Sequence, residues 1–410
     1  MALQLVLVVL LVAACLVGSG CGGGPVTLLT ADFQKDPAPA GWELDGPKGA
    51  TPDGEWAGPD AAGGSPHLVA RAGWWQSPPV PVEPFAYYRL RFRAKATEMA
   101  YVAVVFSDDE GNELVADAYD GVDASPDWQD AEVCFRGHAL AVEARVRFQP
   151  IAAPVAVDDV TVEAVGADEV RAWYDRADPV VPTVAPGVPD ERWALLPGTM
   201  RHLAAGGRLR VVILGDSIAN DTANSLFETR LARAYPKARL EVVTSVRGGT
   251  GCEYYGADGR VAEYVLRFRP NLVIIAGISH GYDAEAIRGV VRQIRDGSEA
   301  EVLVLSDAVC PKERMLGTFL ERSRLPDAAA REWVRTWPER LRQMLAEERV
   351  EFLDMRSAWD ASVEASGRPP EWFMRDPVHA NARGKQVLGR ILQSYFEPRG
   401  GRPAPRTGED

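Results

Sequence analysis

Lysine is scarce in this chain, and no block of basic residues stands out along it. The sequence holds 45 Lys and Arg residues against 58 Asp and Glu residues, which gives a formal net charge of −13 at pH 7. Proteins that bind nucleic acids display a basic patch or stripe toward the phosphate backbone. The composition therefore argues against a nucleic-acid partner, while the acidity favours solubility and identifies no ligand.

Cysteine is also scarce, with 5 residues in the whole sequence. Two of them lie near the start of the chain, and the other three, Cys134, Cys252 and Cys310, fall in different segments. An odd number of cysteines in separate segments does not form a disulfide framework. A bridge between Cys252 and Cys310 and a pair of buried thiols are both compatible with this pattern.

The start of the chain carries an almost unbroken apolar run from Leu3 to Val12. This run is too short for a permanent transmembrane helix and is typical of the hydrophobic part of a signal peptide. Val-Ala-Ala-Cys ending at Cys15 and Gly-Ser-Gly-Cys ending at Cys21 both resemble the lipidation site of bacterial lipoproteins, although the first four residues include no Lys or Arg. We expect residues 1–21 to be a signal peptide. The protein is then exported, and is either secreted or attached to the cell envelope through a lipid on Cys15 or Cys21.

The length of 410 residues exceeds one ordinary core, and 46% hydrophobic with 25% charged residues is a globular composition. Residues 26–165 contain strand-like patterns, the clearest being the alternation of apolar and charged residues from Tyr87 to Ala94. Further strands are expected over 100–106, 131–135, 144–148 and 155–162. Short strands at this spacing, with no convincing helix between them, predict an all-β jelly-roll sandwich. Residues 166–200 are expected to form a linker with one short helix around 169–176.

Residues 201–397 alternate between strand and helix patterns. The expected strands cover 209–214, 239–243, 271–276, 301–305 and 350–354, and the expected helices cover 224–235, 283–295, 327–348 and 381–396, with Pro338 kinking or splitting the third helix. This alternation predicts a three-layer α/β domain, a parallel sheet with helices on both faces. Ligands of such sheets bind beyond the carboxyl ends of the strands. Residues 398–410 are rich in Pro, Gly and charge and are expected to be a disordered tail.

A candidate nucleophile follows the first strand of the α/β region, in Gly215-Asp216-Ser217. A serine at the carboxyl end of a strand, on the turn before a helix, is exposed to ligand, and its backbone N–H can bind an oxyanion. Serine needs a base, and the C-terminal half offers His202, His280 and His379. His379 lies three residues after Asp376, just before the last predicted helix. There Asp376 can accept from one imidazole nitrogen while the other nitrogen faces Ser217.

Gly-Asp-Ser after the first strand and Asp-x-x-His before the last helix resemble the first and last conserved blocks of the SGNH/GDSL hydrolase family. The resemblance spans about residues 208–396. It implies a flavodoxin-like α/β fold and ester cleavage without a metal or an organic cofactor. It also implies that Ser217 is the nucleophile, that His379 is the base and that Asp376 orients the imidazole.

The middle blocks of the family fit less closely. Val246 to Gly251 resembles the second block, and the resemblance implies that the N–H of Gly251, with Gly249 as the alternative, joins that of Ser217 in the oxyanion hole. The third block is normally Gly-x-Asn-Asp, but Ser279 stands here in place of the oxyanion-binding Asn, followed by His280. Loss of one oxyanion donor costs about 10²–10³ in kcat. This departure therefore weakens catalysis unless the Ser279 hydroxyl, His280 or a water supplies the hydrogen bond.

The N-terminal sandwich resembles the galactose-binding-like jelly rolls that occur as carbohydrate-binding modules, mainly through Val157 to Val162 as a closing strand. Trp74, Trp75 and Tyr254 are the candidate substrate-binding residues, because aromatic rings suit the apolar faces of pyranosides. Trp74 and Trp75 are adjacent in a strand and point to opposite faces, so one of them is expected on the outside.

Together these features predict an exported serine esterase that acts on an acylated carbohydrate and removes its O-acetyl groups. Two alternatives use the same sequence features. One is a hydrolase of lipids or other small esters. The other is a non-catalytic surface protein that binds glycans, in which the altered third block has abolished turnover.

Overall fold

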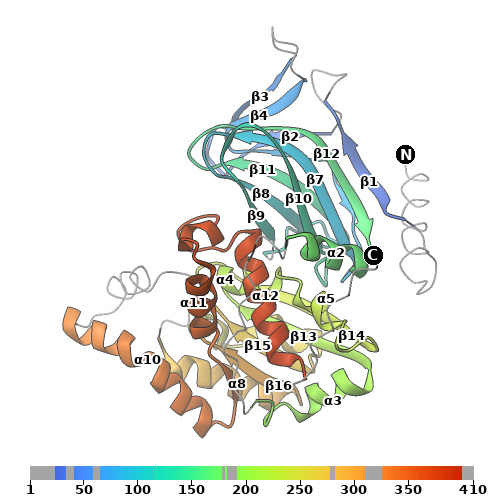
Figure 1. Cartoon of the computed structure of the whole chain (residues 1–410). Helices are drawn as coiled ribbons and strands as arrows, with labels where there is room; N and C mark the ends of the chain where they lie inside the picture. Colours follow the sequence, from blue (N-terminus) through green and yellow to red (C-terminus); the bar gives the residue numbers. More distant parts are fainter. Residues whose placement is uncertain are drawn as a thin grey trace, which may run out of the picture.

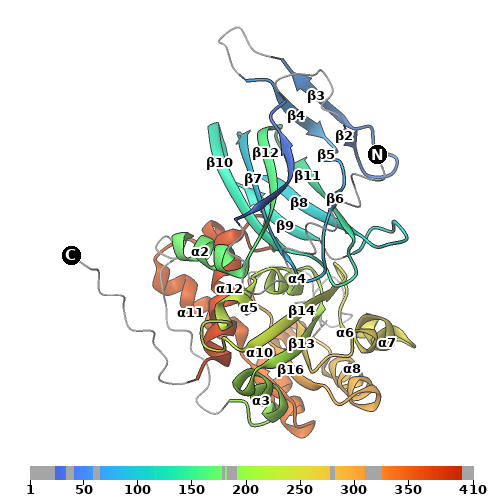
Figure 2. The ribbon, with the colours of Figure 1, turned by 90° about the vertical axis from the view of Figure 1, so that its right-hand side faces the viewer.

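The computed structural model describes residues 24–33, 41–58, 65–115, 117–177, 181, 192–277, 282–309 and 326–398. These residues form a β-rich N-terminal region stacked on an α/β C-terminal region (Figures 1 and 2). The signal peptide with Cys15 and Cys21, the residues Ser279, His280 and Cys310, and nearly all of the predicted tail lie outside the described residues. Within the described ranges, no helix is long and apolar enough to cross a membrane.

The N-terminal region consists of two antiparallel sheets. The first has the order β10 (Ser125–Arg136), β7 (Tyr87–Ala96), β12 (Val155–Val165), β4 (His67–Ala72) and β3 (Asp53–Ala57), with β1 (Val26–Ala31) also paired to β12. The second has the order β2 (Glu43–Asp45), β5 (Trp74–Gln76), β11 (Glu143–Pro150), β8 (Ala100–Ser107) and β9 (Ala118–Val122), with β6 (Val80–Pro81) also paired to β11. The predicted β-rich region is therefore confirmed as a pair of antiparallel sheets.

The alternation in β7 explains how these sheets pack. Leu90 and Phe92 are buried in a core that both sheets share, together with residues of β8 such as Val102. The arginines that alternate with them point to the opposite face, where Arg89 pairs with Glu163 of β12 at 2.8 Å. In β7, the face toward the core is thus apolar and the opposite face is polar, as is usual for antiparallel sheets.

In the described part of the C-terminal region, five strands form one parallel sheet. Their order is β14 (Ala238–Val246), β13 (Gly207–Gly215), β15 (Leu272–Ala276), β16 (Glu301–Leu305) and β17 (Glu351–Leu353). In chain order this is 2-1-3-4-5, the order of flavodoxin-like sheets. The predicted parallel sheet flanked by helices is confirmed.

Helices cover both faces of this sheet, so its strands are apolar on both sides. One face is covered by α3 (Pro197–Ala205), α4 (Ser217–Ala223), α5 (Phe227–Leu231), α11 (Met355–Ser366) and α12 (Ala382–Phe396). The other face is covered by α6 (Cys252–Tyr255), α7 (Arg260–Tyr264), α8 (Ala284–Gly297) and α10 (Asp327–Glu347).

Some helix boundaries differ from the sequence-based expectation. The single helix predicted over 224–235 is wrong, because α4 begins earlier, at Ser217, and α5 follows separately. Asp216 caps α4, and Leu226 adopts a left-handed conformation with φ 50° that interrupts the helical path. Pro338 lies inside α10, which continues past it. The short helix expected near 169–176 is α2 (Ala167–Ala177).

A buried polar contact joins the two regions. Arg136 at the end of β10 forms an ion pair with Glu228 of α5, and the two side chains are 3% and 2% exposed. Arg136 also donates to the carbonyl oxygen of Ala223 at 3.2 Å, and Tyr87 of β7 donates to Glu228 at 3.3 Å. The sandwich is therefore fixed on the α/β region through charges shielded from water.

We predict that Arg136→Ala lowers the free energy of unfolding by about 3–5 kcal/mol, because it leaves Glu228 buried without its cation. The control is Arg176→Ala, which breaks an exposed pair with Glu132 and should cost less than about 1 kcal/mol. Urea denaturation of the two variants measures the difference. Equal losses would show that the interface pair does not depend on burial.

A buried histidine in the same interface makes stability depend on pH. His138 donates from Nε2 to the carbonyl oxygen of Thr244 at 2.9 Å, and its Nδ1 accepts from the N–H of Leu140 at 3.2 Å. Burial lowers the pKa of His138 to about 4. The unfolded chain therefore takes up this proton first as the pH falls.

The contribution of neutral His138 to stability is present above the ordinary histidine pKa of about 6.5 and is lost as the pH falls toward about 4. We predict that His138→Gln flattens the dependence of the unfolding free energy on pH in this window. Urea denaturation of both proteins at several pH values tests this. Parallel curves for the variant and the parent protein would contradict it.

Candidate active site

The turn that presents Ser217 is built from its two preceding residues. Gly215 ends β13 where a Cβ atom would lie 2.1 Å from the carbonyl oxygen of Ala276 in β15, so only glycine fits. Asp216 is the N-cap of α4, and its Oδ1 accepts from the N–H of Ile218 at 2.9 Å. Ser217 is therefore the first residue of α4, half-buried at the carboxyl end of the strand.

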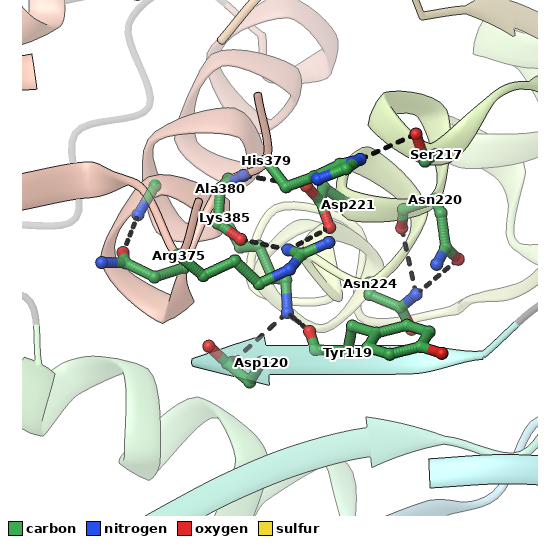
Figure 3. Close-up of polar contacts among 12 residues, drawn as sticks. Tyr119, Asp120, Ser217, Asn220, Asp221, Asn224, Arg375, His379, Ala380 and Lys385 are labelled. Atoms are coloured by element: carbon green, nitrogen blue, oxygen red, sulfur yellow. Dashed lines mark hydrogen bonds and ion pairs between the residues drawn. The ribbon is translucent and has the colours of Figure 1, made fainter. Parts of the chain in front are cut away.

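The loop before α12 presents His379 to this serine. Nε2 of His379 lies 2.8 Å from Oγ of Ser217 (Figure 3). Nδ1 of His379 lies 2.9 Å from Oδ1 and 2.7 Å from Oδ2 of Asp376. Oδ1 of Asp376 also accepts from the backbone N–H groups of Val378 and His379 at 2.9 and 3.0 Å. The structure thus brings the three predicted catalytic residues into one hydrogen-bonded row.

The environment keeps Asp376 ionised. Burial acts to raise the pKa of Asp376, but hydrogen bonds from His379, from the Val378 N–H and from Tyr101 outweigh burial and hold the pKa below its ordinary range. A carboxylate at this position accepts the Nδ1 proton of His379. That leaves Nε2 of His379 unprotonated and able to accept the proton of Ser217.

The hydrogen bond from Tyr101 comes from the other region of the chain. The hydroxyl of Tyr101, on β8 of the sandwich, donates to Oδ2 of Asp376 at 2.8 Å. Burial and this bond raise the pKa of Tyr101 well above its ordinary value, so it acts as a neutral donor. Tyr101 was not among the site residues predicted from the sequence. The alternation of β8 could place it on one face of a strand but could not reveal a contact 275 residues away.

A buried ion pair fixes the loop of His379 to the helix of Ser217. Nη1 of Arg375 lies 2.7 Å from Oδ1 of Asp221 in α4, and the two side chains are 4% and 1% exposed. The second oxygen of Asp221 accepts from the N–H of Ala380 at 2.9 Å (Figure 3). The N–H of Arg375 donates to the carbonyl oxygen of His379 at 2.9 Å. Both sides of the histidine are therefore tied to α4.

Strand β9 of the sandwich packs against the same loop. Lys385 of α12 pairs with Asp120 of β9 at 3.3 Å and donates to the carbonyl oxygen of Tyr119 (Figure 3). A Cβ atom at Gly121 would lie 2.9 Å from Cβ of Arg375, which shows how closely the two elements approach. The candidate site thus lies where the two regions of the chain meet.

The second block lies beside the serine turn. The N–H of Arg247 donates to the carbonyl oxygen of Gly215 at 3.0 Å, and the hydroxyl of Tyr255 donates to the same oxygen at 2.6 Å. Gly251 is buried at the N-cap of α6, and Gly249 has φ 67°. The oxyanion roles of Ser217 and Gly251 stay predictions, and Ser279 lies outside the described residues.

The predicted substrate-binding aromatic residues occupy three different surroundings. Trp75 packs against the sandwich core and donates from Nε1 to the carbonyl oxygen of Val69 at 2.9 Å. The guanidinium of Arg147 lies over the Trp74 ring at 4.9 Å. Tyr254 has the guanidinium of Arg260 over its ring at 3.7 Å. Their role in binding substrate stays a prediction.

Two further features concern metals and thiols. Within the described parts of the chain, no group of three or more His, Cys, Asp or Glu side chains is arranged to bind a metal ion. Cys134 is a buried free thiol, and Cys252 is buried as well. Burial raises the pKa of Cys134 to about 12 and that of Cys252 further, so both thiols stay protonated.

We predict that Gly277→Ala destabilises the protein by about 2 kcal/mol or more and lowers kcat. Gly277 has φ 105°, and a Cβ atom there would lie 2.2 Å from Oδ1 of Asp216, the oxygen that caps α4 below Ser217. Gly248→Ala is the control for stability, because its Cβ would meet no atom within 4 Å, and it should change the unfolding free energy by less than about 0.5 kcal/mol. Denaturation curves that coincide for the two variants would contradict this account.

Comparison with known proteins finds a family match in the α/β region. Residues 213–387 match the GDSL-like Lipase/Acylhydrolase family. No curated protein matches the chain. Among solved structures, the enzymatically active domain of tailspike protein 4 from bacteriophage CBA120 shares 17% identity over 34% of this chain and 22% of that chain, with a TM-score of 0.28.

Two esterases are among the other similar structures. A catalytic mutant of Axe2, an acetylxylan esterase from Geobacillus stearothermophilus, shares 16% identity over 48% of this chain and 98% of that chain, with a TM-score of 0.38. A two-domain esterase active on acetylated mannans shares 17% identity over 54% of this chain and 60% of that chain, with a TM-score of 0.38. The chain spans less than two thirds of the tailspike domain and of the two-domain esterase. By this match, residues 213–387 of the α/β region correspond to a GDSL-like lipase/acylhydrolase domain.

Proposed function

We propose that the protein is an exported serine esterase that removes acyl groups, above all O-acetyl groups, from a carbohydrate. The observation that carries this proposal is the row of hydrogen bonds from Asp376 through His379 to Ser217, at 2.7 and 2.8 Å. A serine beside an imidazole that a carboxylate orients is the arrangement used for nucleophilic attack on an ester carbonyl.

In the first half of the reaction, Oγ of Ser217 attacks the ester carbonyl carbon while Nε2 of His379 takes the hydroxyl proton. The negative charge that develops on the carbonyl oxygen is bound by the N–H groups of Ser217 and Gly251, with Ser279 as the third predicted donor. When the tetrahedral intermediate collapses, His379 gives its proton to the sugar oxygen. The alcohol leaves, and the acyl group stays on Ser217.

In the second half, a water molecule attacks the acyl carbon and His379 takes the proton of that water. Collapse of the second tetrahedral intermediate breaks the bond to Ser217, and His379 returns the proton to Oγ of the serine. The products are the free carboxylic acid and the unchanged enzyme. Asp376 remains a carboxylate in both halves and stabilises the imidazolium.

The surroundings of the triad support a carbohydrate polymer as the substrate. Trp75 pairs with Phe148, and Phe148 pairs with Val102 on the core side of the sandwich. The neighbouring residues, Trp74 and Tyr101, therefore lie on the outer face, with their backbones two strand spacings or about 10 Å apart. Since Tyr101 reaches Asp376, this outer face extends from the Trp74 ring toward the triad, in which the His379 side chain is 21% exposed. A sugar chain lying along it can present an acyl group to Ser217 without being enclosed.

Export is part of the proposal and is supported by the apolar run from Leu3 to Val12. A polysaccharide substrate is too large to enter a cell intact, so an enzyme acting on it has to work outside. Attachment to the cell envelope through a lipid on Cys15 or Cys21 is compatible with this location.

We predict that the purified full-length protein hydrolyses p-nitrophenyl acetate and releases acetate from acetylated xylan or mannan, the substrates named for the two esterases above. Ser217→Ala should lower kcat by about 10⁴-fold or more, because it removes the nucleophile. Ser357→Ala is the matched control. This serine is exposed on α11 and bonds only locally to Asp354, so turnover should not change.

The same assay separates the alternatives. Acetate release from the polymers supports the carbohydrate esterase. Rates of p-nitrophenyl ester hydrolysis that fall as the acyl chain becomes longer support it as well. Faster turnover of long-chain esters would instead identify a lipid hydrolase. Equal background rates in the parent protein and Ser217→Ala would overturn the esterase proposal, and glycan arrays would then test the binding protein.

A further inference from the structure

The two oxygens of Asp376 share the Nδ1 of His379, at 2.9 and 2.7 Å, and differ in their other partners. Oδ1 accepts from two N–H groups of its own loop, at Val378 and His379. Oδ2 lies 2.7 Å from Nδ1 of His379 and accepts from the hydroxyl of Tyr101 at 2.8 Å. Tyr101 thus supplies the bond to Oδ2 that comes from outside the loop, and with it the carboxylate is held at both oxygens.

The strand that carries Tyr101 is fixed relative to the loop that carries Asp376. Tyr101 lies on β8 opposite Gly121 of β9, and Gly121 packs against Arg375, the residue before Asp376. The Tyr101 ring also meets the Tyr119 ring edge to face, with centroids 6.2 Å apart. A donor on such a braced strand restricts the rotation of the carboxylate more than a mobile surface side chain would.

We propose that Tyr101 is a positioning residue of the esterase, which holds Asp376 in the plane of the His379 imidazole, so that the sandwich completes the active site. This inference rests on the proposed function, because it assigns to Tyr101 a part in the reaction of Ser217. If Tyr101 has this role, the α/β region on its own lacks one of the hydrogen bonds that orient its catalytic residues.

Removal of the Tyr101 hydroxyl has two chemical consequences. The carboxylate gains freedom to rotate away from the imidazole, which lowers kcat and leaves substrate binding largely unchanged. The carboxylate also retains more of its negative charge, and more negative charge beside an imidazole favours the protonated ring, which cannot act as a base. The acidic limb of the rate profile therefore moves to higher pH.

Further charged or titratable groups lie on the elements that pack around this loop, and they stay in place when Tyr101 is substituted. They are Asp216 and Asp221 at α4, Tyr119 and Asp120 on β9, Arg375 in the loop and Lys385 on α12. A change in the pH profile of a Tyr101 variant is thus attributable to the lost hydroxyl.

The test compares Tyr101→Phe with Tyr87→Phe in the full-length chain, with p-nitrophenyl acetate as substrate. Tyr87 is a matched control, because its hydroxyl also donates from the sandwich to a carboxylate of the α/β region, that of Glu228 at 3.3 Å. We expect Tyr101→Phe to lower kcat about tenfold, to change KM less than about twofold and to move the acidic limb to higher pH. Tyr87→Phe should keep the parent profile.

A double-mutant cycle with Asp376→Asn separates an effect of Tyr101 that acts through Asp376 from a general loss of stability. If Tyr101 acts through Asp376, Tyr101→Phe should lower kcat less than about twofold in the Asp376→Asn background. Thermal unfolding of all variants shows whether each is folded at the assay temperature. A full tenfold loss in that background would overturn the inference, because it would mean that Tyr101 acts by another route.

Two other results would overturn the inference and are distinguishable from each other. If the parent protein is active and Tyr101→Phe matches Tyr87→Phe in kcat and in pH profile, Tyr101 only packs at the interface and the esterase proposal stands. If the parent protein shows no turnover that depends on Ser217, the proposed function fails and this inference fails with it.

Discussion

The ion pair between Arg375 and Asp221 is the contact on which the arrangement of the site depends. Asp221 belongs to the helix that begins with Ser217, and Arg375 belongs to the loop that ends with His379. Buried ion pairs often add little net stability, since removing both charges from water is costly, but they fix geometry. Here the pair and the bond from the N–H of Ala380 to Asp221 hold the serine and the histidine at hydrogen-bond distance.

Several features of the site could be predicted from sequence because their causes are local. Gly215 is needed where two strand ends approach, Asp216 caps the helix that follows, and Ser217 comes next at the carboxyl end of the strand. Asp376 and His379 are three residues apart, and that short loop suffices to bond their side chains. The parallel sheet was predictable for a similar reason, since strand and helix patterns alternate over short stretches.

Other features could not be predicted, because they depend on contacts between distant segments. Period-2 alternation places Tyr101 on the outer face of β8 but does not reveal what that face meets. Arg136 and Glu228 are charged residues that sequence reasoning assigns to the surface, yet the meeting of two regions buries them. The start of α4 was placed too late, because the helical pattern after Asn224 is more apolar than the capped turn at Asp216.

The polar character of the interface bears on how the molecule assembles. Many of the side chains that meet across it are charged, among them Arg136, Glu228, Asp120 and Lys385. Surfaces of this kind remain hydrated before they meet, so each half of the chain can fold around its own apolar core and dock afterwards. In that order of events, the hydrogen bond from Tyr101 to Asp376 forms only when the two regions dock. Full catalytic competence then appears as the last step of folding, after both cores are already formed.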